Sequence, residues 1–348
     1  MSNTATVLAF DFGASSGRAI RAVYDGQNLT YEEIHRFENV PIEKDGHLCW
    51  DVETLLKEIH TAIQKAGTFD SLGFDTWGVD FGLLDADGHL LANPVHYRDA
   101  RTNGKPEQAA ACMPAEELYA HTGNQIMAIN TLFQLLALQE QEPELLQKAE
   151  QILFMPDLFA ALLGAEPVCE RSIASTSQML DPRTGQWSRE VLTAYGLKEN
   201  HFAPLVASGT VTGTLTTGAK IIAVAGHDTQ CASAAMPCAE EDAEHTAFLS
   251  CGTWSLLGTE LDTPILTADS CQSGLSNELG ANGRINYLKN IIGLWLIQES
   301  RREYKRCGQA YSFAELEQQA LAAEPLRSFI DPDAPEFVAP GDLPGRIQ

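Results

Sequence analysis

The chain has 348 residues, of which 44% are hydrophobic and 20% charged, and its formal net charge is −24. This length exceeds what a single hydrophobic core usually supports, so we expect two domains. The apolar content excludes a disordered chain. The strong negative charge argues against nucleic acid and anionic membranes as partners. An anionic ligand would therefore need local backbone donors or a metal ion for its binding.

The cysteines and the short apolar runs indicate a reducing, aqueous environment. Eight cysteines are spread along the chain, without a C-x-x-C pair and without histidines at zinc-ligand spacing. This pattern is typical of reduced thiols rather than of a disulfide framework or a zinc site. Residues 7–10 are too short a run for a signal peptide, and residues 291–297 are too short to span a bilayer. We expect a cytoplasmic protein.

The first predicted elements are three strands followed by a helix. The strands cover residues 7–12, 18–24 and 29–37. Glycine-containing turns connect them, which favours an antiparallel meander. Residues 52–66 carry apolar side chains on one helical face. Asp51 can cap the start of this helix and Gly67 can end it.

Further along the chain, helical and strand patterns alternate. We expect a strand at 72–75, a hairpin turn at 85–88, a mostly helical stretch at 106–163, strands at 211–215 and 221–225, a hairpin at 246–249 and 255–260, and a helix at 291–304. An acidic stretch at residues 240–244 shifts the composition. We place the domain boundary there, with one domain over 1–240 and the other over 241–348.

The first candidate site is the turn Asp-Phe-Gly-Ala-Ser-Ser-Gly-Arg at residues 11–18. It matches neither the P-loop nor the G-x-G-x-x-G pattern. Glycines and serines in a tight turn leave backbone N–H groups free for an anion, and Arg18 adds a charge for phosphoryl oxygens. Asp11, at the end of a buried strand, is placed to hold Mg²⁺. The alternative interpretation is an ordinary glycine-rich hairpin.

The second candidate site follows the strand at 221–225, with the sequence Ala-Gly-His-Asp-Thr-Gln at residues 225–230. Small residues after it favour a helix, so we expect Asp228 near a helix N-terminus, where its ionised form is favoured. Such a carboxylate can accept the proton of a sugar hydroxyl as that oxygen attacks phosphorus. The alternative is a capping aspartate, which stabilises a helix by about 1 kcal/mol.

A third candidate site lies at residues 73–81, where Trp77 stands between Asp75 and Asp80. An aromatic face can cover the C–H surface of a sugar while carboxylates accept hydroxyl protons. Residues 97–103 add further polar groups. Half-buried tryptophans and paired Arg–Asp groups are also common structural features, so both interpretations stay open.

The fourth candidate site is a pair of amides, Asn290 and Gln298. They are eight residues apart, about two helical turns, and we expect them on one helical face. The alternative is a solvated face without a ligand.

Together these segments resemble the FGGY carbohydrate kinases, and within that family the rhamnulokinase branch. The matching motifs follow one another in family order. They are D-F-G-A-S-S-G-R (11–18), E-I-H-R-F (33–37), D-T-W-G-V-D-F (75–81), Y-R-D-A-R-T-N-G (97–104), H-D-T (227–229), G-T-W-S-L-L-G (252–258) and L-K-N-I-I-G-L-W-L-I-Q (288–298). An ordered series of this kind is more specific than any one motif.

The resemblance implies an α/β fold of the actin/hexokinase-like (ribonuclease H-like) type, with a cleft between two domains. It implies Mg²⁺-assisted transfer of the ATP γ-phosphoryl group to O1 of L-rhamnulose, in L-rhamnose catabolism. Asp228 is then the proton acceptor. The implied sugar contacts are Gly78, His227, Asp228, Thr229 and Asn290. The implied ATP contacts are Ala14, Ser15, Ser16, Gly17, Arg18, Thr253 and Gln298.

The end of the chain departs from the family pattern. Rhamnulokinases continue into a segment whose Gly-Gly motif holds the adenosine, whereas residues 331–335 and 344–348 are loop-like. We therefore expect an incomplete second domain. The alternatives are a non-catalytic remnant that binds sugar, a kinase for fuculose or xylulose, and an actin-like or chaperone-type ATPase. The last is disfavoured because it needs no hydroxyl-activating aspartate. No oligomeric state is predicted.

Overall fold

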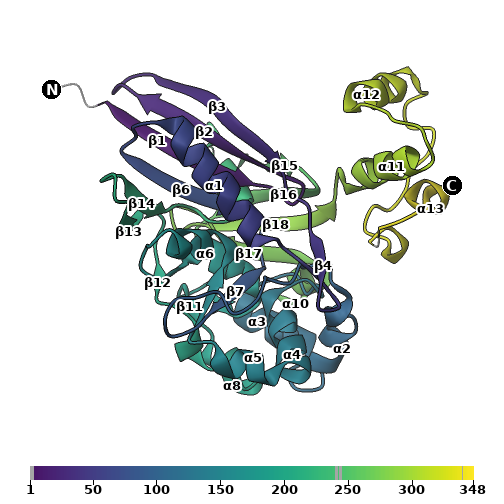
Figure 1. Cartoon of the computed structure of the whole chain (residues 1–348). Helices are drawn as coiled ribbons and strands as arrows, with labels where there is room; N and C mark the ends of the chain where they lie inside the picture. The colour runs from purple at the N-terminus through teal and green to yellow at the C-terminus, as the bar shows by residue number, and fades with distance from the viewer. Residues whose placement is uncertain (1–3, 240–241, 243–244, 339) are drawn as a thin grey trace. The chain divides into compact units, whose positions relative to one another are not determined.

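The computed structural model describes residues 4–239, 242, 245–338 and 340–348 (Figure 1). The chain divides into two compact units. The first contains Met1–Thr246 and Thr259–Leu288, and the second contains Ala247–Gly258 and Lys289–Gln348. The boundary predicted between residues 240 and 241 lies outside the described residues and stays a prediction.

The first unit opens with the predicted antiparallel meander of β1 (Ala5–Phe12), β2 (Ser16–Tyr24) and β3 (Leu29–Glu38). The turn between β2 and β3 is fixed by Asp25, whose Oδ1 accepts hydrogen bonds from the backbone N–H groups of Gln27 and Asn28. Such a side chain replaces a backbone acceptor in the turn.

Helix α1 (Val52–Ala66) has the predicted bounds. Oδ1 of Asp51 accepts from the Thr54 backbone N–H at 3.1 Å, and Gly67 ends the helix with a φ of 67°. The buried face of α1 packs on β2 and β3 (Figure 1). The helix then leads into β6 (Ser71–Thr76), which runs parallel to β1.

The main sheet has the strand order β13-β14-β6-β1-β2-β3, with β13 at Thr210–Thr214 and β14 at Lys220–Ala223. Strands β14, β6 and β1 are neighbours and run in parallel. Because parallel strands point the same way, their carboxyl ends meet at one edge of the sheet. The chain leaves β14 at this edge and enters α9 (Asp228–Ala234).

One face of the sheet is closed by an aromatic cluster. Side chains alternate along a strand, so Leu8, Phe10 and Phe12 share a face, and all three are fully buried. The ring of Phe12 stacks on Phe159 of α6 (Met155–Leu162), with centroids 4.9 Å apart. Phe74 of β6 stacks on Phe10 at 4.8 Å. This cluster holds β1 and β6 against α6.

Between β6 and β14 the chain forms smaller helices and hairpins. They are β7 (Phe81–Leu84), α2 (Lys105–Ala109), α3 (Ala115–Thr122), α4 (Thr131–Gln141), α5 (Pro143–Lys148), β8 (Gln151–Phe154), β9 (Cys169–Glu170), α7 (Arg171–Ala174), β10 (Leu180–Asp181), β11 (Gln186–Trp187), α8 (Arg189–Ala194) and β12 (Leu205–Val206). The predicted helical stretch at 106–163 is interrupted by β8, because this apolar segment pairs with β7. Before α1, β4 (Ile42–Lys44) pairs with β5 (His47–Cys49).

A second sheet has the order β15-β16-β18-β17, with strands at Phe248–Cys251, Trp254–Leu261, Ile285–Ile292 and Leu275–Leu279. The hairpin β15–β16 confirms the hairpin predicted at 246–260. The remaining helices are α10 (Ala268–Gln272), α11 (Trp295–Arg306), α12 (Phe313–Ala322) and α13 (Leu343–Ile347). Within the described ranges, no helix has the length and apolarity needed to cross a bilayer.

Asp80 organises the interior of the first unit. Its side chain is 1% exposed, and its carboxylate accepts four N–H groups. They are the indoles of Trp50 (2.6 Å) and Trp77 (3.0 Å), the Gln134 amide (2.8 Å) and the Tyr97 backbone (3.1 Å). Burial raises the pKa of Asp80 to about 6, although these hydrogen bonds oppose the shift.

The residue before Asp80 has a strained backbone. Val79 has a φ of 66°, a region that costs a β-branched residue about 1–3 kcal/mol. Its N–H donates to Thr176 Oγ1 at 3.1 Å, and its carbonyl accepts from Thr131 Oγ1 at 2.6 Å. These two bonds, with the Asp80 network next to them, fix the peptide groups on both sides of the Val79 Cα.

The close approach of Gly17 to Phe37 gives a first testable prediction. A Cβ at Gly17 would lie 2.2 Å from Cζ of Phe37, whose buried ring packs against Phe12. We expect Gly17→Ala to lower the free energy of unfolding by about 1–3 kcal/mol, measured by urea denaturation. In a Phe37→Ala background the same change should cost almost nothing. An equal cost in both backgrounds would contradict this contact.

The Asp80 network gives a second prediction. A carboxyl whose pKa rises on folding binds more protons in the folded state, so its contribution to stability falls as pH rises from its unfolded to its folded pKa. Between about pH 4 and pH 6, the wild type should lose up to about 3 kcal/mol of unfolding free energy relative to Asp80→Asn. Urea denaturation of both proteins across this range measures the difference. Parallel pH dependences would show that Asp80 is not the titrating group.

Candidate active site

Three aspartates meet at the carboxyl edge of the parallel strands. Asp11 lies near the end of β1, and Asp75 is its register partner on β6, so the two side chains share a face of the sheet. The Thr76 N–H donates to the Gly226 carbonyl at 2.9 Å, which extends the parallel pairing beyond β14. Asp228 follows two residues later as the first residue of α9. Three carboxylates far apart in sequence are thus collected at one edge.

The electrostatics of this edge are dominated by burial and by like charges. Burial raises the pKa of Asp75 well above its usual range, and the charges of Asp11 and Asp228 raise it further, while Arg18 lowers it. Partial burial likewise raises the pKa of Asp228, an effect that His227 opposes. A cation that binds near these three carboxylates therefore stabilises their ionised forms.

The two carboxylate oxygens of Asp228 have different surroundings. Oδ1 accepts from the backbone N–H of Thr229 at 2.6 Å and from its hydroxyl at 3.3 Å, and lies 3.4 Å from Nε2 of His227. No donor among the described residues is bonded to Oδ2, and the side chain is 40% exposed. One oxygen is held in place and the other is open to accept a proton.

Gly78 and His227, both predicted sugar contacts, lie against each other. A Cβ at Gly78 would stand 3.4 Å from Nε2 of His227 and 3.3 Å from Oγ1 of Thr176. His227 is buried at the N-cap position of α9, and its Nδ1 is 3.1 Å from Oε2 of Glu278. The third predicted contact, Thr229, is buried and hydrogen-bonded to Asp228. A side chain at position 78 would therefore crowd His227 and Thr176, so glycine suits this close approach.

Asn39 fixes the loop between β1 and β2 through two hydrogen bonds. Its Nδ2 donates to the Gly13 carbonyl at 2.9 Å, and its backbone N–H donates to the Ser15 carbonyl at 3.1 Å. The loop is closed by a bond from the Gly13 N–H to the Ser16 carbonyl. Within the described part of the chain, the backbone N–H groups of Ala14 and Ser15 are bonded to no acceptor. Two donors thus remain for an anion.

Arg18 and Gly17, the last residues of this loop motif, have structural partners. The guanidinium of Arg18 donates from Nε (2.8 Å) and Nη2 (2.5 Å) to Oδ2 of Asp11, its register partner across the hairpin. Gly17 faces the ring of Phe37. Arg18 therefore orients one carboxylate oxygen of Asp11 and leaves the other, Oδ1, without a partner among the described residues.

In the second unit, Thr253 and Gln298 are in direct contact. Thr253 lies in the turn between β15 and β16, and its Oγ1 donates to Oε1 of Gln298 at 3.2 Å. Its carbonyl accepts from the Trp295 N–H at 3.1 Å, which ties the turn to the start of α11. Asn290 lies on β18, so the prediction that Asn290 and Gln298 share a helical face is wrong. The helix begins only at Trp295, because residues up to Ile292 pair in the sheet.

Of the two interpretations of Trp77 and Asp80, the structure favours the structural one. Trp77 is buried, packs against Trp50 with ring centroids 3.9 Å apart, and donates its indole N–H to Asp80. Arg101, from the neighbouring polar segment, is buried and donates to Gln134. These side chains form the interior behind the Gly78 loop.

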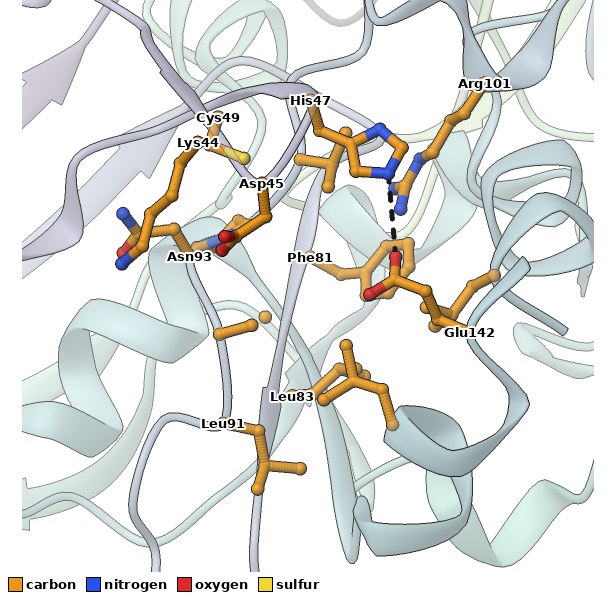
Figure 2. Close-up of a pocket in the computed structure, with 16 residues that line it drawn as sticks. Lys44, Asp45, His47, Cys49, Phe81, Leu83, Leu91, Asn93, Arg101 and Glu142 are labelled. Atoms are coloured by element: carbon orange, nitrogen blue, oxygen red, sulfur yellow. Dashed lines mark ion pairs between the residues drawn. The ribbon is translucent and has the colours of Figure 1, made fainter.

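A separate cavity of about 160 Å³ lies among the β4–β5 hairpin, β7 and helices α4 and α5 (Figure 2). Leucines and Phe81 form its apolar wall. Figure 2 shows the His47 ring facing Glu142, with Nε2 and Oε1 3.8 Å apart, and Arg101 extending toward them. Phe81 and Arg101 of the third candidate segment line this cavity, but Asp11, Asp75 and Asp228 do not, so it is distinct from the three-aspartate edge.

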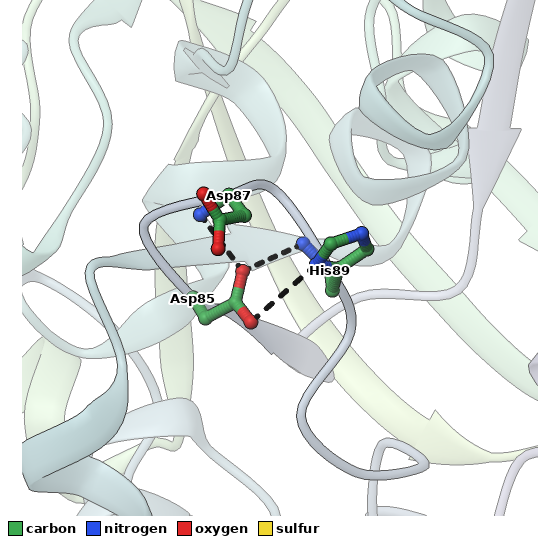
Figure 3. A group of neighbouring side chains, drawn as sticks. All are labelled: Asp85, Asp87 and His89. Atoms are coloured by element: carbon green, nitrogen blue, oxygen red, sulfur yellow. Dashed lines mark hydrogen bonds and ion pairs between the residues drawn. The ribbon is translucent and has the colours of Figure 1, made fainter.

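A cluster of Asp85, Asp87 and His89 has the geometry of a turn (Figure 3). Oδ1 of Asp85 accepts from the backbone N–H groups of Asp87 and His89, both at 2.9 Å. Its Oδ2 lies 3.6 Å from Nδ1 of His89. The aspartate therefore stabilises the predicted hairpin turn after β7.

The site also contains residues that sequence reasoning missed. Asp75 was assigned only to the sugar site. Asp11 and Asp75 each stand at the end of a predicted strand, and this shared position could have indicated that they meet at one sheet edge. Glu278 lies in no motif, and only the fold of β17 brings it to His227. Asn39 had no signal beyond its place after a strand.

Comparison with known proteins places these features in a family. The model of the FGGY family of carbohydrate kinases, N-terminal domain, matches residues 6–234, and the model of the C-terminal domain matches residues 247–348. A rhamnulokinase of Bacteroides thetaiotaomicron is 40% identical, over 98% of this chain and 72% of that protein. A rhamnulokinase of Enterococcus faecalis is 39% identical, over 99% of this chain and 70% of that protein.

Solved structures show the same fold. A xylulose kinase from Lactobacillus acidophilus has a TM-score of 0.74 at 16% identity, over 92% of this chain and 66% of that one. A kinase from Brucella ovis has a TM-score of 0.71 at 20% identity, over 93% of this chain and 67% of that one. The α/β fold of actin/hexokinase-like type is thereby confirmed. The chain belongs to the FGGY family of carbohydrate kinases.

Proposed function

We propose that the chain serves ATP-dependent phosphorylation of L-rhamnulose at O1, giving L-rhamnulose 1-phosphate. The observation that carries the proposal is the carboxylate of Asp228, which has one oxygen held by hydrogen bonds and the other open to accept a proton. It lies with Asp11 and Asp75 at the sheet edge that the Ser-Ser loop between β1 and β2 also borders. Support for the sugar comes from rhamnulokinases that are 38–40% identical over at least 98% of this chain.

At the sugar end, Oδ2 of Asp228 takes the proton of the attacking hydroxyl. Its raised pKa makes the ionised carboxylate a stronger base than an exposed aspartate, while the nearby His227 keeps the ionised form populated. The bonds from Thr229 hold the carboxylate in one orientation. The backbone of Gly78 and Nε2 of His227 form one wall of the sugar site.

At the phosphate end, the β1–β2 loop binds phosphoryl oxygens and the aspartate pair binds the metal ion. The free N–H groups of Ala14 and Ser15 bind phosphoryl oxygens, with Ser16, Gly17 and Arg18 completing the loop. Asp11 and Asp75 fit Mg²⁺, because two adjacent hard-oxygen ligands with mutually repelling charges favour such a cation. When bound, Mg²⁺ neutralises charge on the transferring phosphoryl group.

The second unit supplies the other proposed contacts. Thr253 and Gln298 are assigned to ATP, and their mutual hydrogen bond keeps both polar groups at the tip of the β15–β16 hairpin. Asn290 is assigned to the sugar. We also place the protein in the cytoplasm, since all eight cysteines lie in the described residues and are free thiols.

The role of Asp228 gives a third prediction. Asp228→Asn keeps the size of the side chain but removes its basicity, so we expect kcat to fall by about 10²–10⁴-fold with little change in KM for the sugar. A coupled ADP-release assay with L-rhamnulose measures both constants. Asp87→Asn, in an exposed turn, is the matched control.

Two outcomes of this assay count against different parts of the proposal. Full activity of Asp228→Asn would exclude Asp228 as the base. Turnover of L-fuculose or D-xylulose without turnover of L-rhamnulose would contradict the assigned sugar and leave the base assignment intact.

The aspartate pair gives a fourth prediction, measured with Mn²⁺ as a paramagnetic substitute for Mg²⁺. Asp75→Asn removes one of two adjacent oxygen ligands, so we expect Mn²⁺ affinity, followed by electron paramagnetic resonance in the presence of ADP, to fall at least about tenfold. The Tm should not fall, because the change also removes a buried like charge. Unchanged affinity would exclude Asp75 as a ligand. Asp87→Asn again serves as the control.

A further inference from the structure

A buried carboxylate that belongs to no motif faces the site histidine. Glu278 lies on β17 and is 4% exposed. Its Oε2 accepts from Nε2 of Gln230 at 2.8 Å and lies 3.1 Å from Nδ1 of His227. Gln230 is held in turn by Asn286 of β18, whose Nδ2 also donates to Ser233 at 2.9 Å. The carboxylate is thus fixed by a fully buried amide network.

This network determines how the imidazole of His227 is oriented. Oε2 of Glu278 already accepts from the Gln230 amide, so it acts as an acceptor and Nδ1 of His227 must donate to it. With Nδ1–H committed, Nε2 is the nitrogen that faces Oδ1 of Asp228 at 3.4 Å. The same nitrogen borders the backbone of Gly78. The ring therefore spans the distance between two carboxylates from different elements.

We propose that Glu278 is a positioning residue for phosphoryl transfer: it fixes the ring and tautomer of His227, so that Nε2 is presented to Asp228 and to the sugar. The inference rests on the proposed role of Asp228 as the base. Such carboxylate–histidine pairs orient the outer nitrogen of an imidazole in many enzyme sites. Glu278 itself does not touch the reacting atoms.

The charges around His227 support this arrangement. Glu278 faces it from β17, Asp228 from its own helix, and Glu170 from the end of β9. Burial alone lowers the pKa of His227, but these carboxylates reverse the effect, with Glu278 contributing most, and the pKa is raised. Glu278 is thus both the hydrogen-bond partner of Nδ1 and the carboxylate with the largest electrostatic effect on the ring.

A double-mutant cycle separates positioning from a general structural role. We expect Glu278→Ala to lower kcat by about 10–100-fold, a loss typical for partners that orient a catalytic group. In a His227→Ala background the same change should cost less than about threefold, because Glu278 acts through His227. Glu278→Gln, which keeps an acceptor oxygen, should restore most of the activity. Equal losses in both backgrounds would overturn the proposal.

A second measurement does not depend on turnover. Nitrogen-15 NMR of histidine-labelled protein reports which ring nitrogen of His227 carries the proton. We expect Nδ1 to be protonated in the wild type, and the Nε2–H tautomer of free imidazole to appear in Glu278→Ala. The exposed Glu166→Ala is the matched control, with Tm measured for every variant. An unchanged His227 signal in Glu278→Ala would overturn the proposal, whether or not L-rhamnulose proves to be the substrate.

Discussion

The parallel pairing of β1 with β6, continued from β6 to β14, is the constraint on which the site depends. Sheet register makes Asp11 and Asp75 neighbours on one face, and the bond from Thr76 to Gly226 carries the same alignment to the segment before Asp228. A slip of one residue between β1 and β6 would turn Asp75 to the opposite face. The geometry of this candidate site is therefore a property of strand register more than of any single loop.

Collecting carboxylates at one edge destabilises the folded state, and the rest of the first unit offsets that cost. Among the described residues, Arg18 counteracts the charge of Asp75 and His227 that of Asp228. On the other face of the same strands, stacked phenylalanines bury a continuous apolar layer. The two faces of β1 thus differ in role: the face of Phe10 and Phe12 stabilises the sheet, and the face of Asp11 carries the charge of the candidate site.

The sequence predicted local features well and long-range ones poorly. Helix α1 matched to the residue because Asp51 and Gly67 are local start and stop signals. The start of α11 was misplaced because residues 288–292 suit a strand or a helix equally, and pairing decides between them. Asp80 accepts most of its hydrogen bonds from residues far away in the sequence, and Glu278 likewise reaches His227 from a distant strand. No motif spacing could predict these contacts.

The positive φ of Val79 has a consequence for how such sequences can diverge. Because the hydroxyls of Thr131 and Thr176 hold this unfavourable peptide from two other elements, the three positions are energetically coupled. Loss of either hydroxyl is tolerated most easily when glycine already occupies position 79, which removes the conformational penalty. Substitutions at these sites should therefore accumulate in a preferred historical order, and a chimera that combines Val79 with a lineage lacking one of the two hydroxyls should be less stable than either parent.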